Sequence, residues 1–317
     1  MKHYIGVDIG GTKIAIVKGN RQGKILEKAR FENNLPMREA VAKIIDHVKK
    51  MGSAEAIGIS CGGPLDARSG KILSPPNLVG WDDVPIVSLL EKATGIPAYL
   101  CNDADACALA EWQFGAGKGC RNMVFLTFGT GLGAGLILNG ALYSGTNGGA
   151  GEVGHLRMSR FGPVGYGKSG SLEGFASGGG IAQLARSAAT ECFQTGGKTS
   201  YCESPDQLAS VTAQQVAFAA QNGDPVAIEV YRLCGEMLGR GLAVLIDILN
   251  PERIVLGSIF VRATDLLLPS MKQAISEEAL PMNAASCRIL PAELGENLGD
   301  IAAISIAINQ TEQKEKL

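Results

Sequence analysis

One arrangement occurs twice in the sequence: an apolar strand, a turn that contains glycine and threonine, and a second apolar strand. The first copy is formed by YIGVDIG and TKIAIV within residues 4–17, and the second by MVFLTFG and LGAGLIL within residues 123–138. Duplication of a structural unit is a strong constraint on the fold of a whole chain. It predicts two related lobes, each of which offers a glycine turn to a shared ligand.

Strand and helix patterns alternate along the rest of the chain. Apolar spacing and end signals predict helices at residues 38–50, 87–94, 104–114, 212–222 and 224–250. Further strands are predicted at residues 21–32, 56–60, 97–101 and 252–257. This alternation predicts an α/β architecture with an N-terminal lobe at residues 1–116 and a larger lobe at residues 117–317. We expect the last helix to pack back on the N-terminal lobe and the final TEQKEKL to fray.

Charge and hydropathy exclude several classes of partner. The net charge is −2 and no long run of Lys or Arg occurs, so neither a nucleic acid nor an acidic membrane surface is an expected partner. No stretch reaches the ~20 apolar residues of a membrane span. The eight cysteines include no C-x-x-C pair, and the N-terminus lacks a signal-peptide pattern. We therefore expect reduced cysteines and a cytoplasmic location.

Residues 162–169, GPVGYGKS, match the phosphate-binding pattern G-x-x-x-x-G-K-[ST]. A true P-loop needs a buried strand before its first glycine and a helix that starts at its Lys-Ser pair. The preceding LRMSRF alternates in polarity, and the following GSLEGFASGGG is a poor helix start. The context therefore argues against a P-loop hydrolase.

GISCG, residues 58–62, matches the nucleophile elbow G-x-S-x-G, with Ser60 as the nucleophile. That elbow requires a helix directly after the serine, and Gly62-Gly63-Pro64 disfavours one. A tight turn after a buried strand is the better interpretation.

Two short motifs in the first lobe can carry phosphoryl-transfer chemistry. In DIGGTK, the backbone of Gly10 and Gly11 can approach phosphate oxygens while Asp8 reaches a metal ion, although a plain hairpin turn has the same pattern. In CNDADA, Asn102 and Asp103 follow a buried strand. Asp103 can accept a hydroxyl proton, or the Asn-Asp pair can simply begin the next helix.

GEVGH, residues 151–155, places Glu152 and His155 in a glycine-rich loop, and Glu173 follows nearby in the sequence. One histidine with two carboxylates fits three descriptions: a small metal site, a salt-bridged loop or a set of groups that binds a polyol. Sugar hydroxyls need fixed acceptors of this kind.

Taken together, the motifs resemble the ROK family of sugar kinases and regulators, which has the actin-like (hexokinase/ribonuclease H-like) ATPase fold with two lobes. The resemblance covers nearly the whole chain and rests on DIGGTK (8–13), SPPNLVGW (74–81), Asn102-Asp103, TFGTGLGAG (127–135), AGEVGH (150–155), SLEGFASG (171–178) and IVLGS (254–258). It implies that Asp103 is the catalytic base. The residues that it implies for the sugar are Gly63, Asn77, Asn102, Glu152, His155 and Glu173, with Gly62 nearby.

The resemblance also implies a nucleotide site and Mg²⁺. The residues that it implies for ATP are Gly10, Gly11, Thr12, Lys13, Thr130, Gly131 and Gly257, with Asp8 orienting Mg²⁺. The family usually carries a zinc loop, but its three cysteine positions here hold Val164, Tyr166 and Ser171. None of these is a good zinc ligand, so we expect no structural zinc. We expect packing around Tyr166 and Val164 to support the loop instead.

The sequence therefore predicts an ATP- and Mg²⁺-dependent hexose kinase. Glucose is the favoured substrate, and N-acetylmannosamine and N-acetylglucosamine are the alternatives. A sugar-sensing regulator would need a helix-turn-helix domain before the first strand, which begins by residue 4. A pseudokinase is disfavoured because Asp8, Thr12, Asp103 and Thr130 are present. The resemblance favours a homodimer.

Overall fold

The computed structural model describes residues 2–315, which form two compact units. Unit 1 contains residues 2–121, 135–150 and 293–315, and unit 2 contains residues 122–134 and 151–292. Within the described part of the chain, every helix is too short or too polar to cross a membrane.

Unit 1 is built on a five-stranded sheet with the order β3-β2-β1-β4-β7. Its strands are β1 (His3–Ile9), β2 (Lys13–Asn20), β3 (Ile25–Glu32), β4 (Ile57–Cys61) and β7 (Ala98–Asn102). Strands β1, β2 and β3 are antiparallel, whereas β4 is parallel to both β1 and β7. Two further antiparallel strand pairs are β5 (Leu65–Asp66) with β6 (Lys71–Ile72), and β9 (Ala134–Leu138) with β10 (Ala141–Leu142), of which Ala134 belongs to unit 2.

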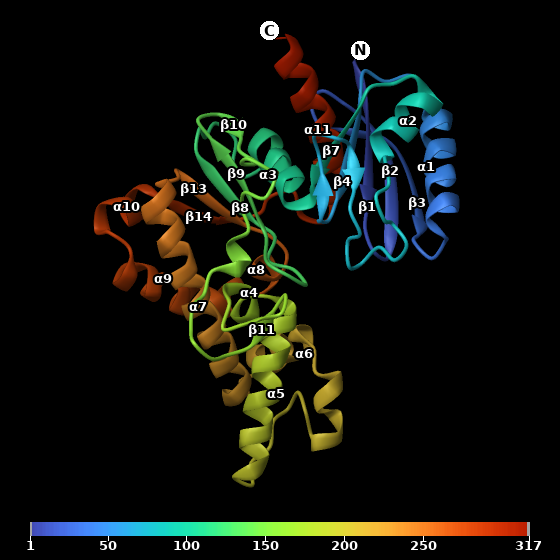
Figure 1. Ribbon diagram of the computed structural model, residues 1–317. Coiled ribbons are helices and arrows are strands. Elements are labelled where there is room, and N and C mark those ends of the chain that lie inside the picture. Colours follow the sequence, from blue (N-terminus) through green and yellow to red (C-terminus); the bar gives the residue numbers. More distant parts are fainter. Residues whose placement is uncertain (1, 316–317) are drawn as a thin grey trace. The chain divides into compact units, whose positions relative to one another are not determined.

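Helices cover both faces of this sheet (Figure 1). One face carries α1 (Met37–Met51) and α2 (Ile86–Thr94), and the other carries α3 (Asp103–Phe114) and α11 (Leu298–Glu315). Helix α11 approaches β4 so closely that a Cβ on Gly58 would lie 2.0 Å from the Ala303 carbonyl oxygen. A residue larger than glycine at this position would therefore force the helix away from the sheet.

Unit 2 combines the parallel strands of a second sheet with most of the helices. In this sheet β13 (Arg253–Leu256) pairs with β8 (Met123–Leu126) and with β14 (Arg288–Pro291). The α-helices are α4 (Leu172–Phe175), α5 (Gly178–Gln194), α6 (Ala213–Gln221), α7 (Pro225–Leu249), α8 (Ile259–Arg262), α9 (Thr264–Glu278) and α10 (Pro281–Ser286). The 3₁₀ helices are η1 (Val153–His155) and η2 (Pro205–Ser210) in unit 2, and η3 (Gly295–Asn297) in unit 1.

The predicted helices are confirmed to within one residue at each end. The predictions are accurate because side chains cap the helix starts. Thr212 and Gln215 form a capping box before α6. The Asp224 side chain accepts from the Val226 and Ala227 N–H groups at the start of α7. The prediction of a frayed end is wrong for residues 311–315, which continue α11. Exposed ion pairs of Lys2 with Glu315 and of Arg21 with Glu312 lie along this last turn. Residues 316–317 lie outside the described residues.

Glu111 joins the end of α3 to the segment that leads into α11. Its side chain is fully buried, with 0% exposure, and accepts from the backbone N–H groups of Ala116 at 2.8 Å, of Glu293 at 3.0 Å and of Leu294 at 3.0 Å. A buried carboxylate that accepts several N–H bonds cannot be removed without the loss of all of those bonds.

We expect Glu111→Ala to lower the free energy of unfolding by about 2–5 kcal/mol, because three part-buried backbone N–H groups lose the buried carboxylate that accepts from them. Urea denaturation measures this change. The matched control is Glu312→Ala, whose exposed ion pair with Arg21 should contribute no more than about 1 kcal/mol. Equal losses in the two variants would contradict this role for Glu111.

Candidate active site

The polar residues of unit 1 that were predicted to act in catalysis gather at one edge of its sheet. Strands β1, β4 and β7 are parallel neighbours, so their carboxyl ends meet there. Asp8 lies beside Ser60 in the strand register, and Asp103 is the first residue of α3, directly after β7. A Cβ on Gly62 would lie 3.7 Å from Asp103 Oδ2, and one on Gly63 would lie 3.6 Å from Asn102 Nδ2. The structure thus brings Asp8, Gly62, Gly63 and the Asn102-Asp103 pair together.

Burial changes the acidity of both carboxyl groups. It raises the pKa of Asp8 from 3.8 to about 6, a hydrogen bond from Ser60 opposes this rise, and the negative charges of Asp103 and Asp300 add to it. Burial also raises the pKa of Asp103, against the lowering effect of the Ala104 N–H, which donates to Asp103 Oδ1 at 2.8 Å. Asp103 nevertheless keeps exposed surface. A carboxylate with a raised pKa that a ligand can reach is suited to accept a proton.

Asn102 caps helix α3, because its side-chain oxygen accepts from the Ala104 N–H at 2.9 Å. The simple capping interpretation of the Asn-Asp pair is therefore correct for Asn102. Asp103 starts the helix, as this interpretation expects, and its second carboxylate oxygen lies beside Gly62.

The turn between β1 and β2 is closed by its own backbone. Gly10 N–H donates to the Lys13 carbonyl at 3.0 Å, and Asn33 Nδ2 donates to the Gly10 carbonyl at 2.8 Å. Thr12 and Lys13 are exposed. A Cβ on Gly11 would lie 2.7 Å from the Asn77 carbonyl oxygen, so the 74–81 loop rests directly on this turn. Asn77, predicted to bind sugar, is exposed there.

In unit 2, three loops converge on Glu173, which lies in the first turn of α4. Its Oε2 accepts from the Leu132 N–H at 3.0 Å, next to the predicted Thr130-Gly131 turn. Each loop places a glycine against this side chain. A Cβ added to Gly131 would lie 2.8 Å from Glu173 Oε2. A Cβ added to Gly154 would lie 3.2 Å from Glu173 Cβ, and one added to Gly165 would lie 2.8 Å from the same atom. Each glycine makes room for the carboxylate and its stem.

Glu152 and His155 flank this cluster on the GEVGH loop, and both are exposed. His155 ends η1. Its ring meets the edge of Tyr166 at a centroid distance of 5.5 Å and an interplanar angle of 87°. Two of the three predicted sugar-binding side chains of unit 2, Glu173 and His155, therefore contact the segment that contains Tyr166.

That segment is the apparent P-loop, and it has a different structure. Residues 164–169 form a hairpin in which β11 (Val164–Gly165) pairs with β12 (Lys168–Ser169). No helix starts at Lys168-Ser169, and Lys168 Nζ donates to the His155 carbonyl. The elbow interpretation of Ser60 also fails, because Ser60 lies inside β4 and is only 2% exposed.

A pocket of about 460 Å³ opens beside the Gly129-Thr130 turn of unit 2. The start of α5 forms one wall: Gly178 N–H donates to the Gly129 carbonyl at 2.8 Å, and Gly179 also lines the pocket. Ser258 forms part of another wall, and it directly follows Gly257, the first residue after β13. An accessible helix start next to a glycine turn favours an anionic ligand.

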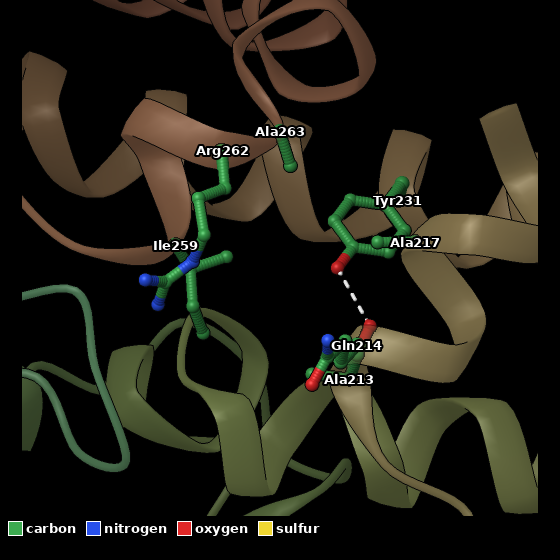
Figure 2. A pocket seen from close by; sticks show the side chains of 7 residues that line it. All are labelled: Ala213, Gln214, Ala217, Tyr231, Ile259, Arg262 and Ala263. Carbon is green, nitrogen blue, oxygen red and sulfur yellow. Dashed lines mark hydrogen bonds between the residues drawn. The ribbon is translucent and has the colours of Figure 1, made fainter.

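A second pocket of about 340 Å³ shares part of this lining (Figure 2). Arg262 and Ile259 of α8 face Tyr231 of α7 across it, and the Tyr231 hydroxyl donates to the Ala213 carbonyl at 3.0 Å. Gln214 stands at its border. The mixture of aliphatic, aromatic and polar groups suits a flat heterocycle.

The sequence interpretation missed the lining residues Gly178, Gly179, Gln214 and Arg262. The run SGGG at residues 177–180 was a signal for the first two, because Ser177 caps α5 through the Gly180 N–H at 3.0 Å. Gln214 and Arg262 had no comparable signal, since they reach the pocket from helices distant in the sequence.

The family model described as "ROK family" matches residues 4–310. The chain belongs to the ROK family. It is 35% identical to a glucokinase of Halalkalibacterium halodurans over 99% of this chain and 97% of that protein. It is also similar to the solved ROK hexokinase of Thermus thermophilus, with 29% identity, a TM-score of 0.83, and coverage of 98% of this chain and 99% of that one.

A Streptomyces griseus ROK glucokinase solved with glucose and AMPPNP is likewise similar, with 29% identity, a TM-score of 0.76, and coverage of 96% and 99% of the two chains. These structural neighbours confirm the predicted fold class, the actin-like ATPase fold of ROK sugar kinases.

The family's zinc loop does not fit the residues of this ROK chain. Ser171 Oγ accepts from the Gly174 N–H at 3.1 Å as the cap of α4, Tyr166 contacts His155, and the Val164 side chain is exposed. Across residues 2–315, no group of three or more His, Cys, Asp or Glu side chains is arranged to hold a metal ion. This includes Glu152, His155 and Glu173, so the alternative of a small metal site is not supported.

The raised pKa of Asp8 makes a prediction about stability. Well below pH 3.8 the carboxyl group is protonated in both the folded and the unfolded chain, and well above pH 6 it is ionised in both, with the folded state bearing the unfavourable burial of the charge. The group therefore lowers stability increasingly as the pH rises between these values. We expect Asp8→Asn to raise the free energy of unfolding by about 1–3 kcal/mol at pH 7.5, and by much less at pH 4. Denaturant titrations at the two pH values measure this, and an equal gain at both would show that charge burial is not the cause.

Proposed function

We propose that this ROK-family chain transfers the γ-phosphoryl group of ATP to a hydroxyl of a hexose, with glucose as the preferred acceptor. The observation that carries the proposal is Asp103: an exposed carboxylate with a raised pKa at the start of α3, in a chain similar to glucokinases from end to end. The named activities of relatives and the glucose bound in the Streptomyces griseus structure support the choice of acceptor.

Asp103 acts as the general base. The attacking hydroxyl gives its proton to the Asp103 carboxylate while its oxygen forms a bond to the γ-phosphorus, and the bond from that phosphorus to the bridging oxygen of ADP breaks. The raised pKa brings the carboxylate closer to the operating pH, which favours proton acceptance. Catalysis of this kind rests mostly on positioning and charge stabilisation.

The sugar is held by fixed acceptors and donors. Glu173, whose position is set by the Leu132 N–H, accepts from a sugar hydroxyl with its free lone pairs. Glu152 and His155 add further polar contacts from the GEVGH loop, residues 151–155. In unit 1, Asn77, Asn102 and the Gly63 backbone are the proposed contacts.

The phosphates of ATP are bound by backbone donors. The turn of Gly10, Gly11, Thr12 and Lys13 supplies N–H groups other than that of Gly10, which already donates to the Lys13 carbonyl. The Thr130-Gly131 turn supplies others, and the start of α5 adds a favourable dipole next to Thr130. The adenosine occupies the two joined pockets beside Gly257 and Ser258, with the base between Tyr231 and Arg262.

Asp8 is the residue that fits Mg²⁺. Magnesium is often bound by one or two carboxylates together with substrate phosphates, so a single buried carboxylate at the sheet edge is sufficient. When bound, Mg²⁺ neutralises the charge that develops on the phosphate oxygens. Structural zinc is not part of this proposal.

The eight cysteines are all free thiols, which fits a reducing compartment, and we propose that the enzyme acts in the cytoplasm. The family resemblance supports a homodimer.

We expect Asp103→Asn to lower kcat for glucose phosphorylation by about 10²–10⁴-fold, because the variant lacks the proton acceptor. The Kd for glucose should change by less than about threefold, since Asn102 still caps α3. Coupled ADP assays and calorimetric titration measure the two quantities across glucose, mannose, fructose and the two N-acetylhexosamines. Asp46→Asn, a change at an exposed position of α1 in the same unit, is the control. Unchanged kcat in Asp103→Asn would remove Asp103 from the mechanism.

A further inference from the structure

His155 sits on an exposed loop, where an imidazole ring ordinarily changes rotamer freely. A histidine that binds sugar hydroxyls must instead present its two nitrogens in a fixed direction. The groups that contact His155 therefore matter as much as His155 itself. Tyr166 supplies the ring contact, at 5.5 Å and 87°.

Tyr166 occupies an unusual backbone conformation for its type. It is the first residue of the two-residue turn between β11 and β12, with φ 43°, and Gly167 follows with φ 75°. Both central residues thus have positive φ, the type I′ arrangement in which glycine and asparagine are preferred. Tyrosine is poorly suited to this position, and its side chain is 70% exposed. Neither turn formation nor core packing explains a tyrosine here, whereas the contact with His155 does.

The hairpin that carries Tyr166 is held firmly at its base. Gln183 of α5 makes a paired contact with Val164: its Oε1 accepts from the Val164 N–H and its Nε2 donates to the Val164 carbonyl, both at 2.9 Å. Helices α4 and α5 of unit 2 both pack against β11, as Figure 1 shows.

The second strand of the hairpin is fixed as well. Arg157 Nη1 donates to the Ser169 carbonyl at 2.9 Å, and Ser169 Oγ donates to the Gly162 carbonyl at 3.0 Å. Lys168 Nζ donates to the carbonyl of His155 and so ties the backbone of that residue to the same hairpin. The backbone of His155 and the ring beside it are thus anchored to one element.

We propose that Tyr166 is a positioning residue: its ring, on the hairpin of residues 164–169, sets the orientation of the His155 imidazole for the sugar. The proposal rests on the proposed function in one respect, namely that His155 binds a sugar hydroxyl. Tyr166 acts through His155 and through its aromatic ring, so its hydroxyl group is dispensable.

The test compares three variants. Tyr166→Asn removes the ring but suits a positive φ, so the hairpin is retained, whereas Tyr166→Phe keeps the ring. Phe161→Ala is the matched control, because Phe161 is a 75% exposed aromatic residue of the same loop that stacks with Arg160 instead. Thermal unfolding checks that Tyr166→Asn does not lower the melting temperature.

We expect Tyr166→Asn to raise the KM for glucose about tenfold, with the KM for ATP unchanged and kcat within about threefold. Tyr166→Phe and Phe161→Ala should match the unaltered protein. A zinc-selective chelator in excess Mg²⁺ should leave the KM for glucose unchanged. An unaltered KM in Tyr166→Asn, a Phe variant as impaired as the Asn variant, or a rise in KM on chelation would each overturn the proposal.

A second readout does not depend on catalysis. The chain has three histidines, so the His155 ring protons can be assigned by NMR with a His155→Gln reference. In the sugar-free protein, the ring current of Tyr166 should shift these protons, and Tyr166→Asn but not Tyr166→Phe should abolish the shift. A shift that the Asn variant retains would contradict the positioning contact. If the shift behaves as expected but no hexose is phosphorylated, the proposed function fails while the contact stands.

Discussion

The carboxylate of Glu173 makes the contacts on which the proposed sugar-binding part of unit 2 depends. One backbone N–H, from Leu132, fixes it, and glycines of three separate loops, Gly131, Gly154 and Gly165, leave the space that it occupies. The loops cannot shift independently, because each is packed against the same side chain. A single acidic residue is therefore in contact with both the Thr130-Gly131 turn and the loop that carries His155.

In unit 1 the main feature is the burial of two carboxyl groups, and not several loops that meet at one side chain. The parallel strands β1, β4 and β7 bring Asp8 and Asp103 to one sheet edge, where burial raises the pKa of both carboxyl groups. This arrangement lowers stability, as expected where a fold keeps charged groups ready for a ligand. Mg²⁺ and the sugar hydroxyl are the ligands that would relieve it in the proposed reaction.

Most secondary structure could be predicted from the sequence because periodicity and capping agree, as at Thr212 and Asp224. The apparent P-loop could be rejected for the same reason: its flanks lacked a strand and a helix, and the structure places a hairpin there. Chain ends and tertiary contacts were harder to predict from the sequence. Residues 311–315, which were predicted to fray, continue α11 and form exposed ion pairs with Lys2 and Arg21. Arg262 and Gln214 reach their pocket only through packing of α6 and α8. The Gln183 contact with Val164 likewise joins residues that no local pattern connects.

The central claim is that this ROK-family protein is a hexose kinase that uses ATP. The most direct measurement is phosphorus NMR of the protein with Mg²⁺, ATP and glucose, followed over time and repeated without sugar. The account predicts that the γ-phosphate signal is replaced by a sugar phosphomonoester signal, with ADP formed in equal amount, only when glucose is present. Release of inorganic phosphate at the same rate without sugar, or no consumption of ATP with any hexose, would contradict it.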